Sequence, residues 1–304
     1  MSLSKIILGF VIYGYMCAGL HAQEIEVLIL GIAQDAGHPQ IGCVKPCCSE
    51  SYKNTLNQHR VASLAISDGE NFYIIDATPS IVEQYQTASD HFSGMSLGGI
   101  FLTHAHIGHY TGLMHFGREA MSSKELPVYV MPRMKNFLEK NGPWSQLVEL
   151  KNIELHDLQD EKPVSLGELT ILPLEVPHRD EFSETVGYLI KGSSSSLLYI
   201  PDIDKWETWD RPIDKLISKV DFVLLDGTFF DGDEVPGRNL YEIPHPFVVE
   251  SIEHLRNLSD ENKNKVYFIH LNHTNPLLDT DNEAYQRVIK EGMHIAKRGM
   301  TFQL

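Results

Sequence analysis

Short apolar runs separated by turn residues recur along most of the sequence. The runs are rich in branched and aromatic residues and are only a few residues long, which is typical of buried strands. They predict strands at 26–31, 61–67, 71–76, 99–103, 127–131, 169–176, 185–191, 196–200, 222–226 and 265–270. The Asp68-Gly69 pair between the second and third runs predicts a hairpin.

Segments with a helical pattern lie between these strands. They predict helices at 79–88, 110–120, 133–140, 206–219 and 247–255. The same order, strand-rich and then helical, occurs in both halves of the chain, without a sequence repeat. Because a sheet must bury its apolar faces, this order favours an α/β fold in which two stacked sheets are covered by helices.

The N-terminus has a different character. Lys5 precedes the apolar run 6–20, and Ala22 offers a small residue for cleavage. This pattern predicts a secretory signal peptide over 1–22, followed by a single domain over 23–304 in an exported, periplasmic or extracellular protein. An uncleaved anchor is the alternative, although the run is shorter than the roughly 20 apolar residues that span a bilayer.

Charge limits the classes of partner. The 304-residue chain has a formal net charge of −16 at pH 7. Such a chain offers no basic face to nucleic acid, and an anionic membrane surface repels it. We therefore expect a small-molecule substrate, no nucleic acid partner and no membrane insertion after signal cleavage. The pattern indicates no particular oligomeric state.

Three histidines directly after the run 99–103 carry the strongest chemical signal. His104, His106 and His109 stand at i, i+2 and i+5. Alternate strand residues face the same side, so His104 and His106 can point at one spot, which His109 approaches from the next segment. Converging neutral imidazoles are typical of a transition-metal site, most often zinc. The alternative is three unrelated surface histidines, since the chain has 15 histidines.

Four further residues with ligand chemistry end apolar strands. Asp76, His178, Asp202 and His270 each follow such a run. Taken singly, each is typical of a polar residue at the solvent edge of a sheet. Strand ends that collect at one edge are also where binding sites form in layered folds.

In their order, these residues resemble the metallo-β-lactamase superfamily. There, Asp, H-x-H-x-D-H, His, Asp or Cys, and His follow one another at strand ends. The resemblance implies an αββα sandwich of two mixed sheets flanked by helices, with metals at the shared sheet edge. It implies one metal on His104, His106 and His178, a second on His109 and His270, Asp202 bridging the two, and Asp76 orienting a ligand histidine.

Gly108 departs from the family motif, which has Asp at this position. That acid is normally a ligand of the second metal and a proton acceptor, so the second site is weak, recruits His273, or is empty. Asp202 is then the best carboxylate to orient an attacking water, and His273 joins it as a candidate for catalysis. His245 and Asp226 are candidates to contact substrate or transfer protons, although His245 between two prolines is also typical of a plain loop residue.

Three cysteines remain beyond the predicted signal peptide, and all lie in one loop: Cys43, Cys47 and Cys48. Because the number of cysteines is odd, disulfides within the chain cannot pair all of them, although an exported protein favours disulfides. One disulfide with a free thiol is one interpretation. A structural zinc completed by His38 or His59 is the other.

Within the superfamily, the segments 37–40, 224–230 and 268–278 resemble pyrroloquinoline-quinone biosynthesis protein B. Their Asp-Gly-Thr-Phe and Thr-Asn-Pro strings are unusual. This resemblance implies a structural zinc in the cysteine loop, although the spacing is not the usual C-x-C-x-x-C. Many members of that subfamily have lost the H-x-H histidines that this chain keeps, and the subfamily is cytoplasmic. The function of this chain therefore need not follow from the resemblance.

The leading hypothesis is a metal-dependent hydrolase with one or two zinc ions, or with iron or manganese instead. Water bound to zinc loses its proton near neutral pH and attacks an ester, amide or phosphodiester. The second hypothesis is an oxidoreductase that uses iron and O₂, as the biosynthetic subfamily is thought to do. The third is a non-catalytic module that binds a metal or ligand. No P-loop, dinucleotide fingerprint or nucleophile elbow in the sequence competes with these hypotheses.

Overall fold

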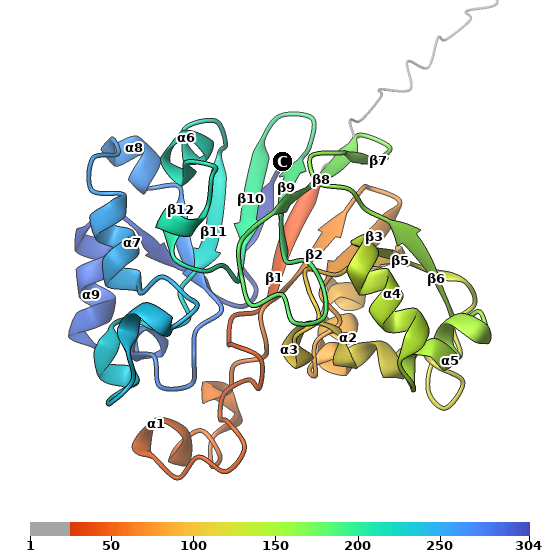
Figure 1. Ribbon diagram of the computed structural model, residues 1–304, viewed down its shortest axis with the longest axis horizontal. Coiled ribbons are helices and arrows are strands. Elements are labelled where there is room, and N and C mark those ends of the chain that lie inside the picture. The colour runs from red at the N-terminus through yellow and green to blue at the C-terminus, as the bar shows by residue number, and fades with distance from the viewer. Residues whose placement is uncertain (1–24) are drawn as a thin grey trace, which may run out of the picture.

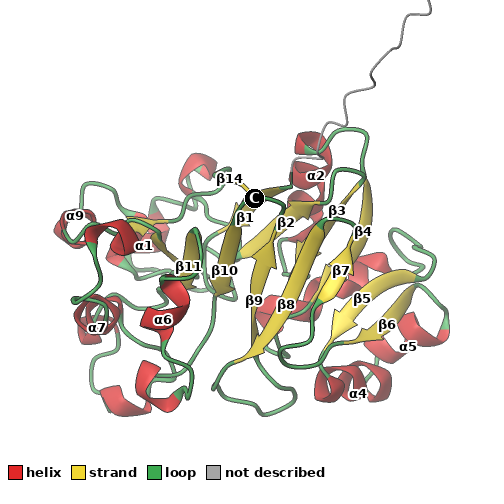
Figure 2. Ribbon diagram, turned by 90° about the horizontal axis from the view of Figure 1, so that it is seen from above, coloured by secondary structure: helices red, strands yellow, loops and turns green. Residues whose placement is uncertain are grey.

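Two seven-stranded sheets stack to form the centre of the protein (Figure 1). The structure is a computed structural model, and it describes residues 25–304. The predicted signal peptide over 1–22 lies outside the described residues. Helices lie on the outer sides of the two sheets, so the architecture is the αββα sandwich that the sequence predicted (Figures 1 and 2).

The strands follow one another along the chain in an order that builds each sheet from one half of the sequence, apart from β14. They are β1 Glu26–Gly31, β2 Ser63–Ser67, β3 Asn71–Ile75, β4 Ser96–Phe101, β5 Leu126–Val130, β6 Ile153–Asp157, β7 Val164–Leu166, β8 Leu169–Glu175, β9 Val186–Lys191, β10 Ser196–Ile200, β11 Phe222–Asp226, β12 Val266–Ile269, β13 His294–Ile295 and β14 Thr301–Gln303. The first sheet has the order β14-β1-β2-β3-β4-β5-β6, and the second has β13-β12-β11-β10-β9-β8-β7.

Short helices connect the strands and cover the sheets. They are α1 Pro46–Ser49, α2 Ile81–His91, α3 Ile107–Tyr110, α4 Pro132–Lys140, α5 Trp144–Glu149, α6 Ile213–Ile217, α7 Val248–His254, α8 Asp260–Lys263 and α9 Glu283–Lys290. Helices α2, α4 and α5 lie beside the first sheet, and α6, α7 and α9 lie beside the second (Figure 2). Within residues 25–304, no helix combines the length and the apolar character that crossing a membrane requires.

Strand β1 illustrates why a continuous apolar run suits this fold. Val27 and Ile29 pack into the core that the two sheets share, whereas Leu28 and Leu30 lie on the opposite face, in a second core that also includes residues of α2 and α4. All four side chains are at most 2% exposed. Because successive strand residues point to opposite faces, a strand covered on both sides must be apolar at every position.

The polar residues that follow the strands lie close together because neighbouring strands run in the same direction. β3 and β4 are parallel, and so are β10, β11 and β12 in the second sheet. Parallel neighbours end at the same sheet edge, where sites form in α/β folds. The chain turns sharply there, since Asp76 and His270 have φ angles of 68° and 65°.

Two predicted helices differ from the structure. The segment 110–120 forms a 3-10 helix over Thr111–Phe116, in which Gly112 packs so closely that a Cβ atom on it would lie 2.2 Å from the Thr78 carbonyl oxygen. The segment 206–219 is divided into a 3-10 turn and α6. Pro212 separates them, because a proline starts a helix but cannot continue one.

Candidate metal centre

The first cluster of potential metal ligands contains His104, His106, His178 and Asp202. The histidines follow β4 and β8, and the aspartate follows β10. Nε2 of His104 lies 2.8 Å from Nδ1 of His106 and 3.3 Å from Oδ2 of Asp202. Nε2 of His178 lies 3.3 Å from Oδ1 of the same carboxylate. The structure therefore brings four ligand side chains from both sheets to one point.

The second cluster contains Asp35, His109 and His270, whose ligand atoms lie within 4.8 Å of one another. Nε2 of His109 lies 3.3 Å from Oδ1 of Asp35 and 3.9 Å from Oδ2 of Asp202. Asp202 thus lies between the two clusters. Burial raises the pKa of Asp35, but the neighbouring His109 ring lowers it by more, so its pKa is below the usual value.

The sequence prediction did not include Asp35. The signal that would have found it is its position shortly after β1. β1 is antiparallel to β2, and β2 is antiparallel to β3, so β1 and β3 end at the same sheet edge. Asp35 therefore stands after β1 much as Asp76 stands after β3.

Hydrogen bonds orient the histidines of the first sheet. Nδ1 of His109 lies 2.7 Å from Oδ2 of Asp76. Nδ1 of His104 lies 3.0 Å from Oγ1 of Thr103, which itself donates to Asp76 at 2.9 Å. Nδ1 of each ring therefore carries the proton, and Nε2 is directed toward the cluster. Such partners set the tautomer of ligand histidines in metalloproteins.

The second sheet repeats this arrangement. Thr228 Oγ1 donates to Oδ1 of Asp226 at 2.7 Å and lies 2.9 Å from Nδ1 of His270. The His270 ring consequently turns Nε2 toward the second cluster. An aspartate and a threonine thus orient a ligand histidine at each of the two sheet edges.

Unpaired polar atoms concentrate at these two clusters. Ten buried side-chain polar atoms in the described part of the chain lack a hydrogen-bond partner, and six of them belong to the clusters. They are Oδ1 of Asp35, Nε2 of His109, Nδ1 and Nε2 of His178, Oδ1 of Asp202 and Nε2 of His270. Buried polar atoms are normally paired. Imidazole nitrogens and carboxylate oxygens that converge without partners fit divalent metal ions such as zinc.

The protonation of the histidines also fits metal binding. Burial lowers the pKa of His178 to about 4, and it lowers the pKa values of His104 and His270 below the usual value. These rings are therefore neutral at pH 7, which is the form that binds metals. Burial also lowers the pKa of His109, but the carboxylates of Asp76 and Asp35 raise it well above its usual value. A cation in the second cluster would therefore replace a proton on His109.

Cys43, Cys47 and Cys48 form a third cluster with His273. Sγ of Cys47 lies 3.9 Å from Sγ of Cys43 and 4.0 Å from Sγ of Cys48, and all three thiols are free. Disulfide sulfurs are about 2.05 Å apart. Two sulfurs bound to one tetrahedral zinc at about 2.3 Å lie about 3.8 Å apart. The spacing fits a structural zinc and not the disulfide alternative.

The histidines expected to complete this zinc site do not do so. Nε2 of His38 lies 2.7 Å from the carbonyl oxygen of Cys47, and its Nδ1 lies 3.1 Å from that of Asn57. Both ring nitrogens of His38 thus face backbone carbonyls. Neither His38 nor His59 belongs to the cluster, whose fourth member is His273.

His273 is accordingly not where we expected it, beside the histidine motif. The backbone explains its position. The amide of Leu271 donates to the carbonyl oxygen of Ile32 at 2.7 Å, so the chain after His270 runs beside the loop that carries the cysteines. Nδ1 of His273 lies 2.9 Å from Oδ1 of Asn272, which leaves Nε2 available for a metal.

His245 is a buried part of the metal centre, only 5% exposed, and not a plain loop residue. Its Nδ1 lies 2.9 Å from Oδ2 of Asp226 and 3.2 Å from Oδ1 of Asp202. Burial lowers the pKa of His245, but the carboxylates of Asp226 and Asp202 raise it by more, to about 10 in the metal-free protein. Without a metal, this histidine therefore carries a proton beside the first cluster, and it forms a further group of potential ligands with Asp202 and Asp226.

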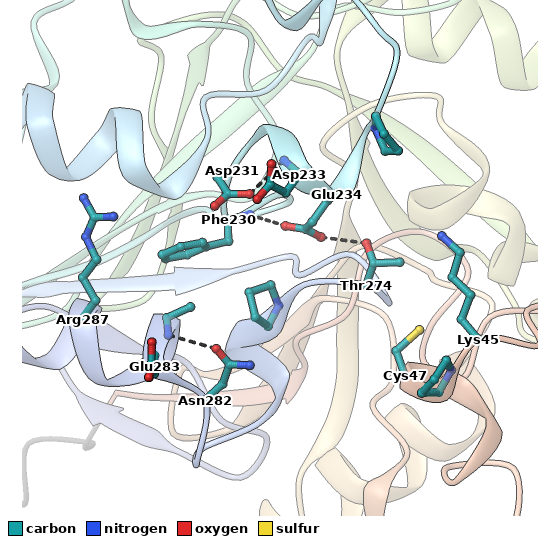
Figure 3. A pocket seen from close by; sticks show the side chains of 14 residues that line it. Lys45, Cys47, Phe230, Asp231, Asp233, Glu234, Thr274, Asn282, Glu283 and Arg287 are labelled. Carbon is teal, nitrogen blue, oxygen red and sulfur yellow. Dashed lines mark hydrogen bonds between the residues drawn. The ribbon is translucent and has the colours of Figure 1, made fainter.

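A cavity of about 830 Å³ lies beside the cysteine cluster (Figure 3). Lys45 and Cys47 line one side of it, and Arg287 of α9 lines another. Glu234 points toward Thr274, whose Oγ1 donates to Oε2 of the glutamate at 2.7 Å (Figure 3). Burial raises the pKa of Glu234 to about 7. Neither histidine cluster lines this cavity, so it is a separate feature of the molecule.

The fold and the clusters together define an αββα metalloprotein. The model of the beta-lactamase superfamily domain matches residues 71–271. The chain belongs to this family.

Coenzyme PQQ synthesis protein B from Pseudomonas fluorescens (strain Pf0-1) is 28% identical to the chain, over 91% of this chain and 99% of that protein. The protein of the same name from Methylorubrum extorquens (strain PA1) is 25% identical, over 92% of this chain and 100% of that protein.

Solved structures show the same fold. The crystal structure of Zn²⁺-bound PqqB from Methylobacterium extorquens has a TM-score of 0.77 at 22% identity, and it covers 92% of this chain and 100% of its own. A diphosphatase from the PhnP family has a TM-score of 0.67 at 21% identity, covering 92% and 97% of the two chains.

Proposed function

We propose that this protein is a metal-dependent hydrolase with a two-metal centre at the shared sheet edge and a structural zinc in the cysteine loop. One observation carries the proposal. Two clusters of ligand side chains, six of whose buried atoms lack a hydrogen-bond partner, meet at Asp202, whose Oδ2 lies 3.3 Å from Nε2 of His104 and 3.9 Å from Nε2 of His109. A carboxylate between two ligand sets suits a pair of adjacent cations.

The ligand sets define what each metal site would contain. His104, His106 and His178 would hold one ion, and His109 with His270 would hold the other. Zinc bound in such a site lowers the pKa of a coordinated water to about 7 and polarises the oxygen of the scissile group.

The chain itself supplies a proton donor for the leaving group. The Asp226 carboxylate fixes the His245 ring through Nδ1 at 2.9 Å, beside Asp202. Hydrolysis of an ester or phosphodiester expels an alkoxide and hydrolysis of an amide expels an amine, and each leaving group must gain a proton. General acid catalysis by a positioned histidine typically contributes about 10²–10⁴-fold to such a step.

An exposed guanidinium beside the first cluster favours an anionic substrate. A terminal nitrogen of Arg179 lies 3.4 Å from Nε2 of His106, and its other terminal nitrogen lies 3.5 Å from Glu181. Arginine is suited to phosphate and carboxylate oxygens. Phosphodiesters therefore come first in a substrate screen, before lactams and neutral esters.

The proposal is tested by metal analysis of protein purified without a histidine tag and exchanged into metal-free buffer. We expect about three zinc ions per chain in the wild type, two at the sheet edge and one in the cysteine loop. The double variant His104→Ala, His106→Ala should lose at least one of them and all hydrolytic turnover. The matched control His115→Ala, His156→Ala removes two histidines outside the clusters and should change neither quantity.

Two results would overturn the proposal. Zinc that survives fully in the His104→Ala, His106→Ala variant would show that the histidines hold none of it. Iron at the sheet edge, with substrate-dependent O₂ consumption, would support the oxidoreductase alternative.

A further inference from the structure

We propose that Asp35 supplies the carboxylate ligand of the second metal, in place of the acid that the family motif carries at the position of Gly108. This inference rests on the metal centre of the proposed function. It assigns a ligand to the strand-end loop of β1, a part of the chain outside the H-x-H-x-x-H motif. It also gives Gly108 a role, which is to leave space for that loop.

The geometry at Gly108 is the first observation. A Cβ atom built on Gly108 would lie 2.3 Å from Oδ1 of Asp35 and 2.4 Å from its Cα. The Asp35 carboxylate therefore occupies the space into which the side chain of the motif acid would extend. Gly108 does not have a positive φ angle, so its backbone conformation does not require glycine. The close approach of Asp35 accounts for the glycine.

The second observation is the environment of the carboxylate. Oδ1 of Asp35 is buried and has no hydrogen-bond partner, although Nε2 of His109 lies only 3.3 Å away. Nε2 of His270 is likewise buried and unpaired. Three potential ligand atoms from different parts of the chain thus converge without a hydrogen-bond partner. A shared cation satisfies all three, since zinc binds imidazole nitrogen and carboxylate oxygen.

The third observation is how firmly the loop is held. The amide of Leu271 donates to Ile32 at 2.7 Å, and the amide of Gln34 donates to the carbonyl oxygen of Leu271 at 2.9 Å. Because Leu271 directly follows His270, these two bonds fix the loop against the residue beside that ligand.

The opposite side of the loop is held as well. The amide of Ala33 donates to the carbonyl oxygen of Arg60 at 2.9 Å. The amide of Ala62 donates to the carbonyl oxygen of Ala33 at 2.7 Å. The loop is therefore pinned on two sides, so Asp35 has a defined position relative to the histidines. A ligand that is positioned before the metal arrives needs little ordering on binding.

The alternative role for Asp35 is an ion pair with protonated His109 that has no part in metal binding. The two roles predict different metal contents. Removing a metal ligand lowers the affinity of the second site, whereas removing an ion-pair partner of His109 does not remove metal.

The test compares Asp35→Asn with the exposed-acid control Asp233→Asn. Each protein is equilibrated in zinc buffers of graded free concentration, and bound zinc is counted by mass spectrometry. We expect Asp35→Asn to lose one zinc per chain, or to bind it at least tenfold more weakly, while Asp233→Asn matches the wild type. The zinc in the cysteine loop serves as an internal check on folding, because it should remain in every variant.

A second variant tests the geometry without removing any ligand. Gly108→Ala places a Cβ atom where it collides with the Asp35 backbone, so we expect it to weaken the same zinc. The control Gly142→Ala adds a Cβ that would meet no atom within 4 Å outside the adjacent residues, and it should have no effect.

The outcomes separate this inference from the proposed function. Full zinc content in Asp35→Asn and Gly108→Ala, with zinc loss in His104→Ala, His106→Ala, would overturn the role of Asp35 and leave the hydrolase proposal standing. Full zinc content in a His109→Ala, His270→Ala variant would overturn the second metal site, and the role of Asp35 with it.

Discussion

Nδ1 of His109 lies 2.7 Å from Oδ2 of Asp76, and both side chains are fully buried. The carboxylate comes from the end of β3 and the ring from α3, so the hydrogen bond links two elements that surround the metal centre. It fixes the proton on Nδ1 and directs Nε2 toward Asp35 and His270. The ring is therefore oriented for a metal by a residue that is itself not a ligand.

We expect Asp76→Asn to weaken the second metal site about 10–100-fold, the usual effect of removing such a partner. Asn also adopts the positive φ angle of 68° that Asp76 has, so the change tests the carboxylate and not the backbone. Zinc titration with a competing chelator measures the affinity. Asp68→Asn, in the hairpin turn before β3, is the matched control. A change smaller than twofold in Asp76→Asn would contradict the orienting role.

The cysteine loop gives a separate prediction. We expect Cys47→Ser to lose one zinc per chain and to melt at a lower temperature, because a structural zinc contributes directly to folding free energy. The histidine centre should keep its metals. His59→Ala is the matched control, since His59 lies near the loop but outside the cluster. Unchanged zinc in Cys47→Ser would contradict the cluster, and so would loss of zinc in His59→Ala.

The central strands of the fold were predictable from the sequence because they are apolar along their whole length. The predicted bounds of β10 and β11 agree with the structure. β6, by contrast, has the sequence IELHD and a partly exposed face, so it lacks a continuous apolar run. β13 and β14 have two and three residues, too few for any periodic pattern.

The site residues divide in the same way. His104, Asp202 and the other residues next to long apolar runs were candidates because a strand end is visible in the sequence. Asp35 was missed because it stands several residues beyond the end of β1 and not directly after it. The partnership of His273 with the cysteines was missed because it depends on how the segments around Ile32 and Leu271 pair in three dimensions. Backbone pairing between segments that are distant in the chain produces no local pattern in the sequence from which it could be predicted.

The proton donor can be tested independently of the metals. We expect His245→Asn to lower kcat about 10²–10⁴-fold on substrates with poor leaving groups. Asn keeps a donor near the position of Nδ1, so the bond to Asp226 and the metal content should persist. With a nitrophenolate leaving group, which departs without a proton, the loss should fall below about tenfold. The exposed His254→Asn serves as control. Equal losses on both kinds of substrate would contradict proton donation by His245.

Glu234, in the cavity beside the cysteine loop, makes stability depend on pH. Burial raises its pKa from 4.5 to about 7 in the folded protein. Between these values the folded state holds a proton that the unfolded state has released, so stability falls as pH rises from about 4.5 to about 7 and then levels off.

Glu234→Gln cannot ionise, so this part of the pH dependence should disappear from the variant. Between pH 5 and pH 8 we expect the wild type to lose on the order of 1 kcal/mol relative to the variant, a figure reduced for the partial exposure of the side chain. Urea unfolding at the two pH values, with zinc held constant, measures the difference. Asp233→Asn should follow the wild-type dependence, because that neighbouring acid is exposed. If the wild type and Glu234→Gln lose the same stability across this range, Glu234 ionises at its ordinary pKa and its burial beside Thr274 has no energetic consequence.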